Sequence, residues 1–196
     1  MKKLSATIAC ALCTSALAIV PGQPAPAFNV TDLAGKPVNL ADYKGKTVVL
    51  EWHNFGCPFV QKHYRSGNMQ ALQKKYGNEV VWLAVNSTTK SASDYEEPNR
   101  IDSKLRDFKA APARYLMDEP GAMGMAYGAK VTPHMYIIDP QGKVVYNGAI
   151  DDKRSTNPDD VKTSKNYVVA ALDELKAGKA VSTPATTPYG CTIKYK

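Results

Sequence analysis

Cys57 and Cys191 are the residues of this chain best suited to covalent chemistry. The sequence holds four cysteines in 196 residues, but Cys10 and Cys13 lie in an N-terminal segment that we expect to be removed. The remaining even count, in an exported protein, predicts either one structural disulfide or a reactive thiol with its resolving partner. The residues around Cys57 help to separate these two interpretations.

Cys57 is predicted to lie between a buried strand and a helix. The β-branched run 47–52 is typical of a central strand, and residues 59–76 read as helical, with an interruption near 66–68. Pro58 fits the first helical position, where its missing N–H is not needed. Free N–H groups and partial positive charge at a helix start stabilise a thiolate. We therefore predict that Cys57 is a nucleophile.

The remaining elements predict one alternating α/β domain. Residues 79–86 form a second apolar strand, so residues 47–86 read as a β-α-β unit with parallel strands. An N-terminal hairpin is expected at 29–39. Further along we expect a helix at 98–109, a short edge strand at 114–118, a helix at 121–127, a hairpin at 134–147, a closing helix at 164–176 and an extended tail.

The N-terminus has the pattern of a secretory signal peptide. Two lysines precede an apolar stretch, and Ala16-Leu17-Ala18 is an A-x-A cleavage signature. We expect residues 1–18 to be removed, leaving a domain at 19–178 and a tail at 179–196 in a periplasmic or secreted protein. The C-x-x-C spacing of Cys10 and Cys13 then carries no redox function, and acylation of either cysteine is the alternative.

Composition limits the classes of partner. The chain has 25 Lys and Arg against 18 Asp and Glu, a net charge of +7. The basic residues are scattered, which favours a solvated surface over a nucleic-acid-binding stripe. No apolar run reaches the ~18 residues of a membrane-spanning helix. The sequence also has no glycine-rich phosphate-binding loop, so it implies no organic cofactor.

The motifs around Cys57 resemble a known family. The chain is similar to thioredoxin-like proteins of the alkyl hydroperoxide reductase and thiol-specific antioxidant family, specifically the exported peroxiredoxin-like redoxins, over residues 22–196. The motifs that carry the likeness are Glu51-Trp52-His53-Asn54-Phe55-Gly56-Cys57-Pro58-Phe59-Val60, Lys62-His63-Tyr64, Ala126-Tyr127-Gly128-Ala129, Thr132-Pro133-His134-Met135, Gly148-Ala149-Ile150-Asp151-Asp152 and Pro188-Tyr189-Gly190-Cys191.

This resemblance implies a thioredoxin-like fold, in which a central mixed sheet is flanked by helices. It implies that Pro133 is a cis-proline facing Cys57. The backbone of Thr132 would then be free to pair with an extended substrate or partner. It also implies that the C-terminal tail folds back and brings Cys191 to Cys57.

The activity that the resemblance implies is peroxide reduction. The Cys57 thiolate would attack a peroxide and become a sulfenic acid, and Cys191 would condense with it to a disulfide. A thiol reductant protein, such as a thioredoxin-like donor, would reopen that disulfide. Asn54 and Thr132 are candidate hydrogen-bond donors to the substrate, while Pro58 and Pro133 would set the geometry of the site.

Two departures from the family patterns keep alternatives open. Val60 stands where a dithiol thioredoxin has its second cysteine. Leu50 and Asn54 stand where peroxiredoxins have proline and threonine or serine. One alternative is protein thiol–disulfide exchange through Cys57 and Cys191. The other is a non-enzymatic copper-binding protein in which these cysteines form a structural disulfide.

Glu51 and the histidines are the remaining candidates. A carboxylate buried in this strand would have a raised pKa and could carry a proton to or from Cys57, whereas at a sheet edge it would face solvent. His134 follows Pro133 and is expected near Cys57. There it could tune the thiolate, or form a metal site with His53 or with His63, which otherwise reads as a surface or packing group.

Overall fold

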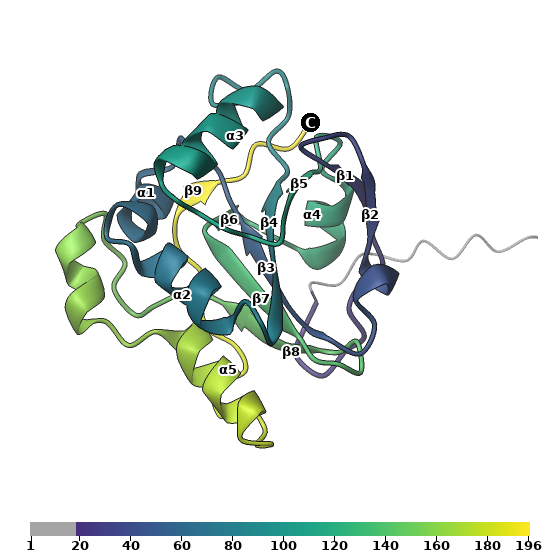
Figure 1. The fold of residues 1–196 in the computed structure, drawn as a ribbon, viewed down its shortest axis with the longest axis vertical. Coiled ribbons are helices and arrows are strands. Elements are labelled where there is room, and N and C mark those ends of the chain that lie inside the picture. The colour runs from purple at the N-terminus through teal and green to yellow at the C-terminus, as the bar shows by residue number, and fades with distance from the viewer. Residues whose placement is uncertain (1–18) are drawn as a thin grey trace, which may run out of the picture.

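A computed structural model describes residues 19–196, so the predicted signal peptide lies outside the described residues. A seven-stranded mixed sheet forms the centre of the fold (Figure 1). Its strand order is β2 (Pro37–Asn39), β1 (Asn29–Asp32), β5 (Arg114–Met117), β4 (Val80–Asn86), β3 (Thr47–Trp52), β7 (His134–Ile138) and β8 (Val144–Gly148). The predicted parallel pairing of β3 with β4 is confirmed.

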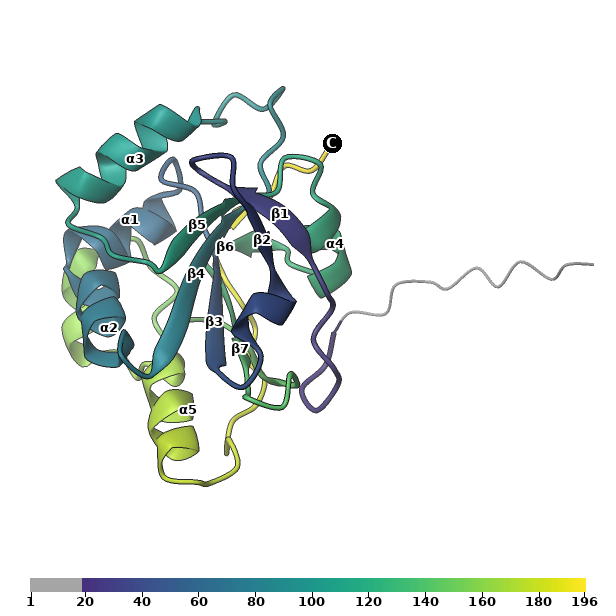
Figure 2. The same cartoon turned by 45° about the vertical axis from the view of Figure 1, so that its right-hand side comes forward.

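Helices cover both faces of this sheet, as Figure 2 shows from the side. One face packs against α1 (Pro58–Arg65), α2 (Asn68–Tyr76), α3 (Pro98–Asp107) and α5 (Tyr167–Lys176). The other packs against α4 (Ala122–Tyr127), the N-terminal segment and the end of the chain. Because both faces are covered, β3 reads as a nearly continuous apolar run. Within residues 19–196 every helix falls short of the length and apolar character that a bilayer crossing requires.

The prediction that residues 114–118 form an edge strand is wrong. The strand β5 lies inside the sheet, parallel to β4 on one side and antiparallel to β1 on the other. Local sequence predicts the N-terminal hairpin, but not where it docks. The hairpin joins the sheet at Thr31 and Asp32, which pair with Met117 and Leu116, and it thereby moves the edge outward to β2.

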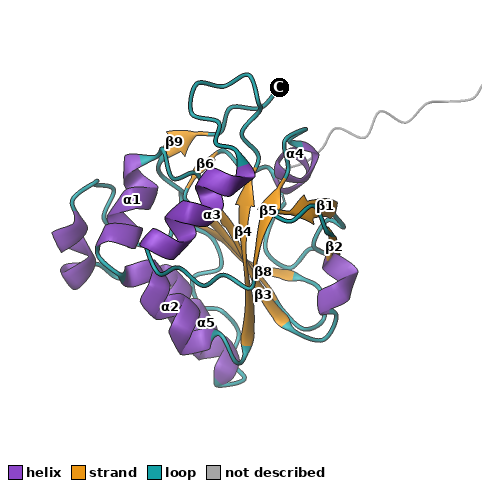
Figure 3. Ribbon diagram, turned by 45° about the horizontal axis from the view of Figure 1, so that its top comes forward, coloured by secondary structure: helices purple, strands orange, loops and turns teal. Residues whose placement is uncertain are grey.

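The C-terminal tail is an integral layer of the fold. Its last strand, β9 (Cys191–Thr192), pairs antiparallel with β6 (Val131–Thr132) in a separate two-stranded sheet. Figure 3 shows these two strands beside the start of α1. The tail therefore folds back over the domain and brings Cys191 to Thr132, beside the start of α1, as the family resemblance implied. Two 3₁₀ helices, Leu40–Tyr43 and Pro158–Thr163, complete the elements.

Candidate active site

Cys57 is the N-cap residue of α1, with an extended backbone (φ −85°, ψ 121°) and Pro58 at the first helical position. The strand β3 delivers the chain to this point, and the helix starts directly after it. The side chain is only 2% exposed and belongs to the core beneath the helices. Its Sγ donates a hydrogen bond to the carbonyl oxygen of Thr132 at 3.0 Å.

The Thr132–Pro133 peptide bond is cis, as predicted. The expectation that the Thr132 backbone is free for an extended substrate is wrong, because Thr132 pairs with Cys191 of β9. A strand edge leaves backbone groups unpaired, and a tail of the same chain is always available to satisfy them. The chain itself thus occupies the edge where a partner was expected.

Cys191 meets Cys57 at this edge. Both thiols are free, Cys57 buried and Cys191 partly exposed. Burial, a hydrogen bond with Cys57 and the proximity of a negative Cys57 raise the pKa of the Cys191 thiol to about 12. It is therefore much easier to ionise one of the two thiols than to ionise both. Two thiols in contact can be joined by a disulfide when an oxidant removes two electrons.

Glu51 is fully buried on β3, between β4 and β7, rather than at a sheet edge. Its two carboxylate oxygens accept hydrogen bonds from the Tyr64 hydroxyl at 3.0 Å and from Trp82 Nε1 at 2.8 Å. Burial raises the pKa of Glu51 to about 7, and the two hydrogen bonds oppose that rise. Both donors belong to the core cluster that contains Cys57. The carboxyl group can thus gain or lose a proton near neutral pH.

Asn54 is held in place by its own neighbours. Its side-chain oxygen accepts from the Gly56 N–H at 2.7 Å, which shapes the turn before Cys57. Its nitrogen donates to Thr88 Oγ1 at 3.0 Å and to the Asp94 carbonyl at 3.2 Å. In this arrangement Asn54 fixes the active-site turn and has its donors engaged.

The three histidines occupy separate places. His53 Nδ1 lies 2.9 Å from the Tyr115 hydroxyl, and His134 Nε2 lies 2.7 Å from Asn147 Oδ1. His63, expected at the surface or in packing, is fully buried. Burial lowers the pKa of His53 to about 3 and that of His134 to about 4. Across residues 19–196 no cluster of three or more metal-ligating side chains occurs.

Sequence reasoning missed a buried polar cluster that joins α1 to the tail. Lys62 Nζ lies 3.0 Å from Asp151 Oδ2 and donates to the Tyr189 hydroxyl at 3.3 Å, and the Tyr189 hydroxyl donates to Asp151. His63 Nε2 lies 3.5 Å from the same hydroxyl. All four residues of this cluster fall in motifs that carried the family resemblance. The signal was present, but no role could be assigned without the contacts.

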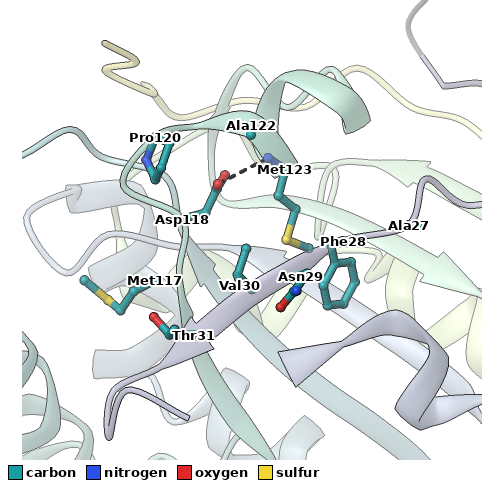
Figure 4. Close-up of a pocket in the computed structure, with 10 residues that line it drawn as sticks. All are labelled: Ala27, Phe28, Asn29, Val30, Thr31, Met117, Asp118, Pro120, Ala122 and Met123. Carbon is teal, nitrogen blue, oxygen red and sulfur yellow. Dashed lines mark hydrogen bonds between the residues drawn. The ribbon is translucent and has the colours of Figure 1, made fainter. Parts of the chain in front are cut away.

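A surface pocket of about 380 Å³ is drawn in Figure 4, and neither cysteine is among the residues that line it. It is lined by β1, the end of β5 and the start of α4, where Asp118 accepts a hydrogen bond from the Met123 N–H at 3.2 Å. Asp118 also accepts from Gly124 N–H and Ser87 Oγ, so its acceptors serve to cap α4. None of the predicted site residues lines this pocket.

Comparisons with known proteins agree with this geometry. The family model described as Redoxin matches residues 20–165. The thiol-disulfide oxidoreductase ResA of Bacillus thuringiensis subsp. konkukian is 31% identical over 125 residues, which is 63% of this chain and 66% of ResA, slightly under two thirds.

Solved structures show the same fold. An uncharacterized conserved protein from Geobacillus kaustophilus superposes with a TM-score of 0.78 at 29% identity, covering 90% of this chain and 92% of that one. The thioredoxin domain of a thiol-disulfide oxidoreductase from Bacteroides vulgatus superposes with a TM-score of 0.53 at 22% identity, covering 74% and 98%.

Proposed function

This chain belongs to the Redoxin family and has the thioredoxin-like fold, and from that premise we propose that it is a thiol–disulfide oxidoreductase. The observation that carries the proposal is that two free thiols meet at Thr132, beside the cis-proline: Cys191 pairs with Thr132, and Cys57 Sγ donates to the Thr132 carbonyl oxygen. The similarity to ResA, named as a thiol-disulfide oxidoreductase, supports it.

The proposed reaction exchanges one disulfide for another. A disulfide of the partner accepts two electrons from Cys57 and Cys191, which become joined by a disulfide, and the partner leaves with two thiols. The reverse reaction oxidises a partner dithiol. The helix start at Cys57 favours the thiolate that forms in either direction. Proteins with thiols or disulfides are the partners that this chemistry requires.

Peroxide fits the site less well as the electrophile. A peroxide molecule must reach the Cys57 sulfur, which is only 2% exposed. The expected donor, Asn54, has its side-chain nitrogen bonded to Thr88 and Asp94. We therefore rank thiol–disulfide exchange above peroxide reduction and test both electrophiles together.

Glu51 is proposed to hold or release the proton that exchange requires. Its pKa of about 7 supports this role, because a group that titrates near the working pH transfers protons in both directions. Its hydrogen bond from Tyr64, a residue of the helix that Cys57 caps, links it to the same part of the core.

Export is proposed from the N-terminal pattern of residues 1–18. A periplasmic or extracellular location would suit a protein whose two remaining cysteines form a reversible disulfide. Mass spectrometry of the protein purified from its native cells tests this, since cleavage after Ala18 would leave Ile19 as the first residue.

Intact mass and peptide mapping test the activity. The reduced protein lacking residues 1–18 is treated with oxidised glutathione or with hydrogen peroxide, beside Cys191→Ser and Cys57→Ser variants. We expect oxidised glutathione to convert the wild type to a Cys57–Cys191 disulfide with loss of two hydrogens. A peroxidase would instead react faster with peroxide and leave one added oxygen on Cys57 in Cys191→Ser. If both thiols stay free after treatment with oxidised glutathione and also after treatment with peroxide, the proposed function is wrong.

A further inference from the structure

The tail that carries Cys191 is held by buried groups rather than laid loosely on the surface. Tyr189 is 4% exposed, and its hydroxyl donates to Asp151, which is itself paired with the fully buried Lys62. Removing one partner of a buried ion pair strongly destabilises the folded protein, because the other charge stays buried without compensation. Two residues before Cys191, the chain is therefore fixed to α1 and to residue 151.

Contacts on both sides of Cys191 extend this attachment. Before it, the Asn147 N–H donates to the Pro184 carbonyl at 3.0 Å, and the Ala149 N–H donates to Thr186 Oγ1 at 2.8 Å. After it, the Ile193 N–H donates to the Lys130 carbonyl at 3.0 Å, and the Tyr195 hydroxyl donates to the Ala129 carbonyl at 2.7 Å. Lifting the tail away from Thr132 therefore requires all of these bonds to break together.

At Gly190 the backbone of the tail lies very close to the backbone of Thr132. A Cβ at this position would lie 1.9 Å from the Thr132 carbonyl oxygen, and the residue has φ +147°. The tail backbone therefore passes directly over Thr132, the residue whose carbonyl oxygen accepts the hydrogen bond from Cys57. As a result Cys57 stays covered, and Cys191 is the partly exposed residue of the pair.

We propose that the partner exchanges its thiol at Cys191, and that Cys57 acts as the buried leaving group. This inference rests on the proposed thiol–disulfide exchange and deepens it by naming the sulfur that faces the partner. An extended partner segment cannot add to the Thr132 edge, because β9 holds that edge. The partner class is therefore a thiol on a small molecule or on a flexible segment, either of which can reach a partly exposed cysteine.

The chemistry of the two sulfurs favours the same direction of attack. In the disulfide-bonded protein, a partner thiolate attacks Cys191 Sγ, and the bond between the partner and Cys191 forms as the Cys57–Cys191 bond breaks. Cys57 leaves with the electron pair, and the helix start favours its negative charge. Cys191 would be the poorer leaving group, since burial raises the pKa of its thiol.

The cycle closes without any further reagent. A second thiolate, from the same partner or from a second molecule of a single-thiol partner, attacks the partner sulfur in the mixed disulfide, which releases Cys191. The two partner thiols have become a disulfide, and both protons go to the reduced cysteines or to solvent. The protein disulfide has gained two electrons.

Acid-quenched trapping tests the proposal. The protein is first oxidised to the Cys57–Cys191 disulfide, then mixed briefly with reduced glutathione, quenched with acid, alkylated and mapped by peptide mass spectrometry. We expect glutathione on Cys191 with the alkyl group on Cys57, in at least about tenfold excess over the reverse product. Glutathione mainly on Cys57 would overturn the proposal.

A control distinguishes this failure from failure of the proposed function. If the starting disulfide never forms, exchange itself is wrong and the choice of sulfur falls with it. If it forms and glutathione adds to Cys57, exchange stands and only the assignment of Cys191 is wrong. Single-cysteine variants coupled to glutathione beforehand provide the two mass standards.

Discussion

The Nζ of Lys62 lies 3.3 Å from the hydroxyl of Tyr189, and this contact joins the helix that begins beside Cys57 to the tail that carries Cys191. Lys62 lies on the helix that Cys57 caps, and Tyr189 lies two residues before Cys191. One buried cluster therefore fixes both cysteines relative to each other. Two sulfurs held in this way react as an intramolecular pair with a high effective concentration.

Replacing Tyr189 by phenylalanine should weaken the Cys57–Cys191 disulfide. The ring keeps its packing against Phe59, but the hydrogen bond to the Asp151 carboxylate is lost. A bond to a charged group contributes about 1.5–3 kcal/mol, so we expect roughly a tenfold or greater loss in the equilibrium constant for forming the disulfide. Equilibration in glutathione redox buffers, followed by alkylation and mass analysis, measures it.

The matched control is Tyr127→Phe, which removes a hydroxyl that donates to the Pro26 carbonyl at 2.7 Å. This change also costs stability, but the hydroxyl that it removes bonds to the N-terminal segment and not to the tail or to either cysteine. An equal shift of the glutathione equilibrium in both variants would contradict a positioning role for Tyr189.

Gly190→Ala should separate β9 from β6. The new Cβ would collide with backbone at Thr132, an atom that cannot move aside as a flexible side chain can. We expect Cys57 to become accessible, so its alkylation by iodoacetamide in the reduced protein should rise by about tenfold or more. Time-resolved alkylation with peptide mapping reads this directly.

Gly178→Ala is the control for this substitution. Gly178 has φ +69° but nothing within 4 Å of its Cβ position, so alanine there introduces backbone strain without a collision. Unchanged Cys57 alkylation in Gly190→Ala, or the same increase in both variants, would argue against close packing of the tail.

Lys62→Met should destabilise the protein strongly. The substitution leaves the Asp151 carboxylate buried without its cation, and breaking a buried pair in this way costs about 3–5 kcal/mol. Lys75→Met is the comparison, because the Lys75–Asp173 pair is half exposed and such pairs contribute about 0–1 kcal/mol. Urea unfolding of both variants tests the difference, and equal losses would show that burial of the Lys62 pair has no special weight.

The buried carboxyl of Glu51 should make stability depend on pH. Burial raises its pKa from 4.5 to about 7 in the folded protein, so between these values the folded chain keeps a proton that the unfolded chain loses. The stability is fully present below about pH 4.5 and falls as pH rises through 7, by on the order of 3 kcal/mol.

Glu51→Gln cannot ionise and should lack that fall. Urea unfolding at several pH values between 4.5 and 8 should therefore show the wild type losing stability relative to the variant as pH rises. The buried histidines are common to both proteins and cancel in this comparison. Parallel stability curves would mean that Glu51 does not keep its proton near neutral pH.

Local sequence was sufficient for most elements and for the place of Cys57. Strand 47–52, the broken helix that follows and Pro58 are read from apolar patterning and from the backbone preferences of proline and glycine. These depend on neighbours along the chain. The cis state of Pro133 was predicted from family resemblance instead, because nothing in its neighbouring residues requires it.

Only the tertiary structure decided how distant segments meet. It placed β5 inside the sheet, buried Glu51, put β9 on the Thr132 edge and brought Tyr189 to Lys62 and Asp151. The physical reason is that strand docking and buried polar pairing depend on which surfaces remain unsatisfied after the rest of the chain has packed. The sequence by itself determined the helix that begins after Cys57, whereas long-range packing determined that Cys57 is buried and Cys191 is partly exposed.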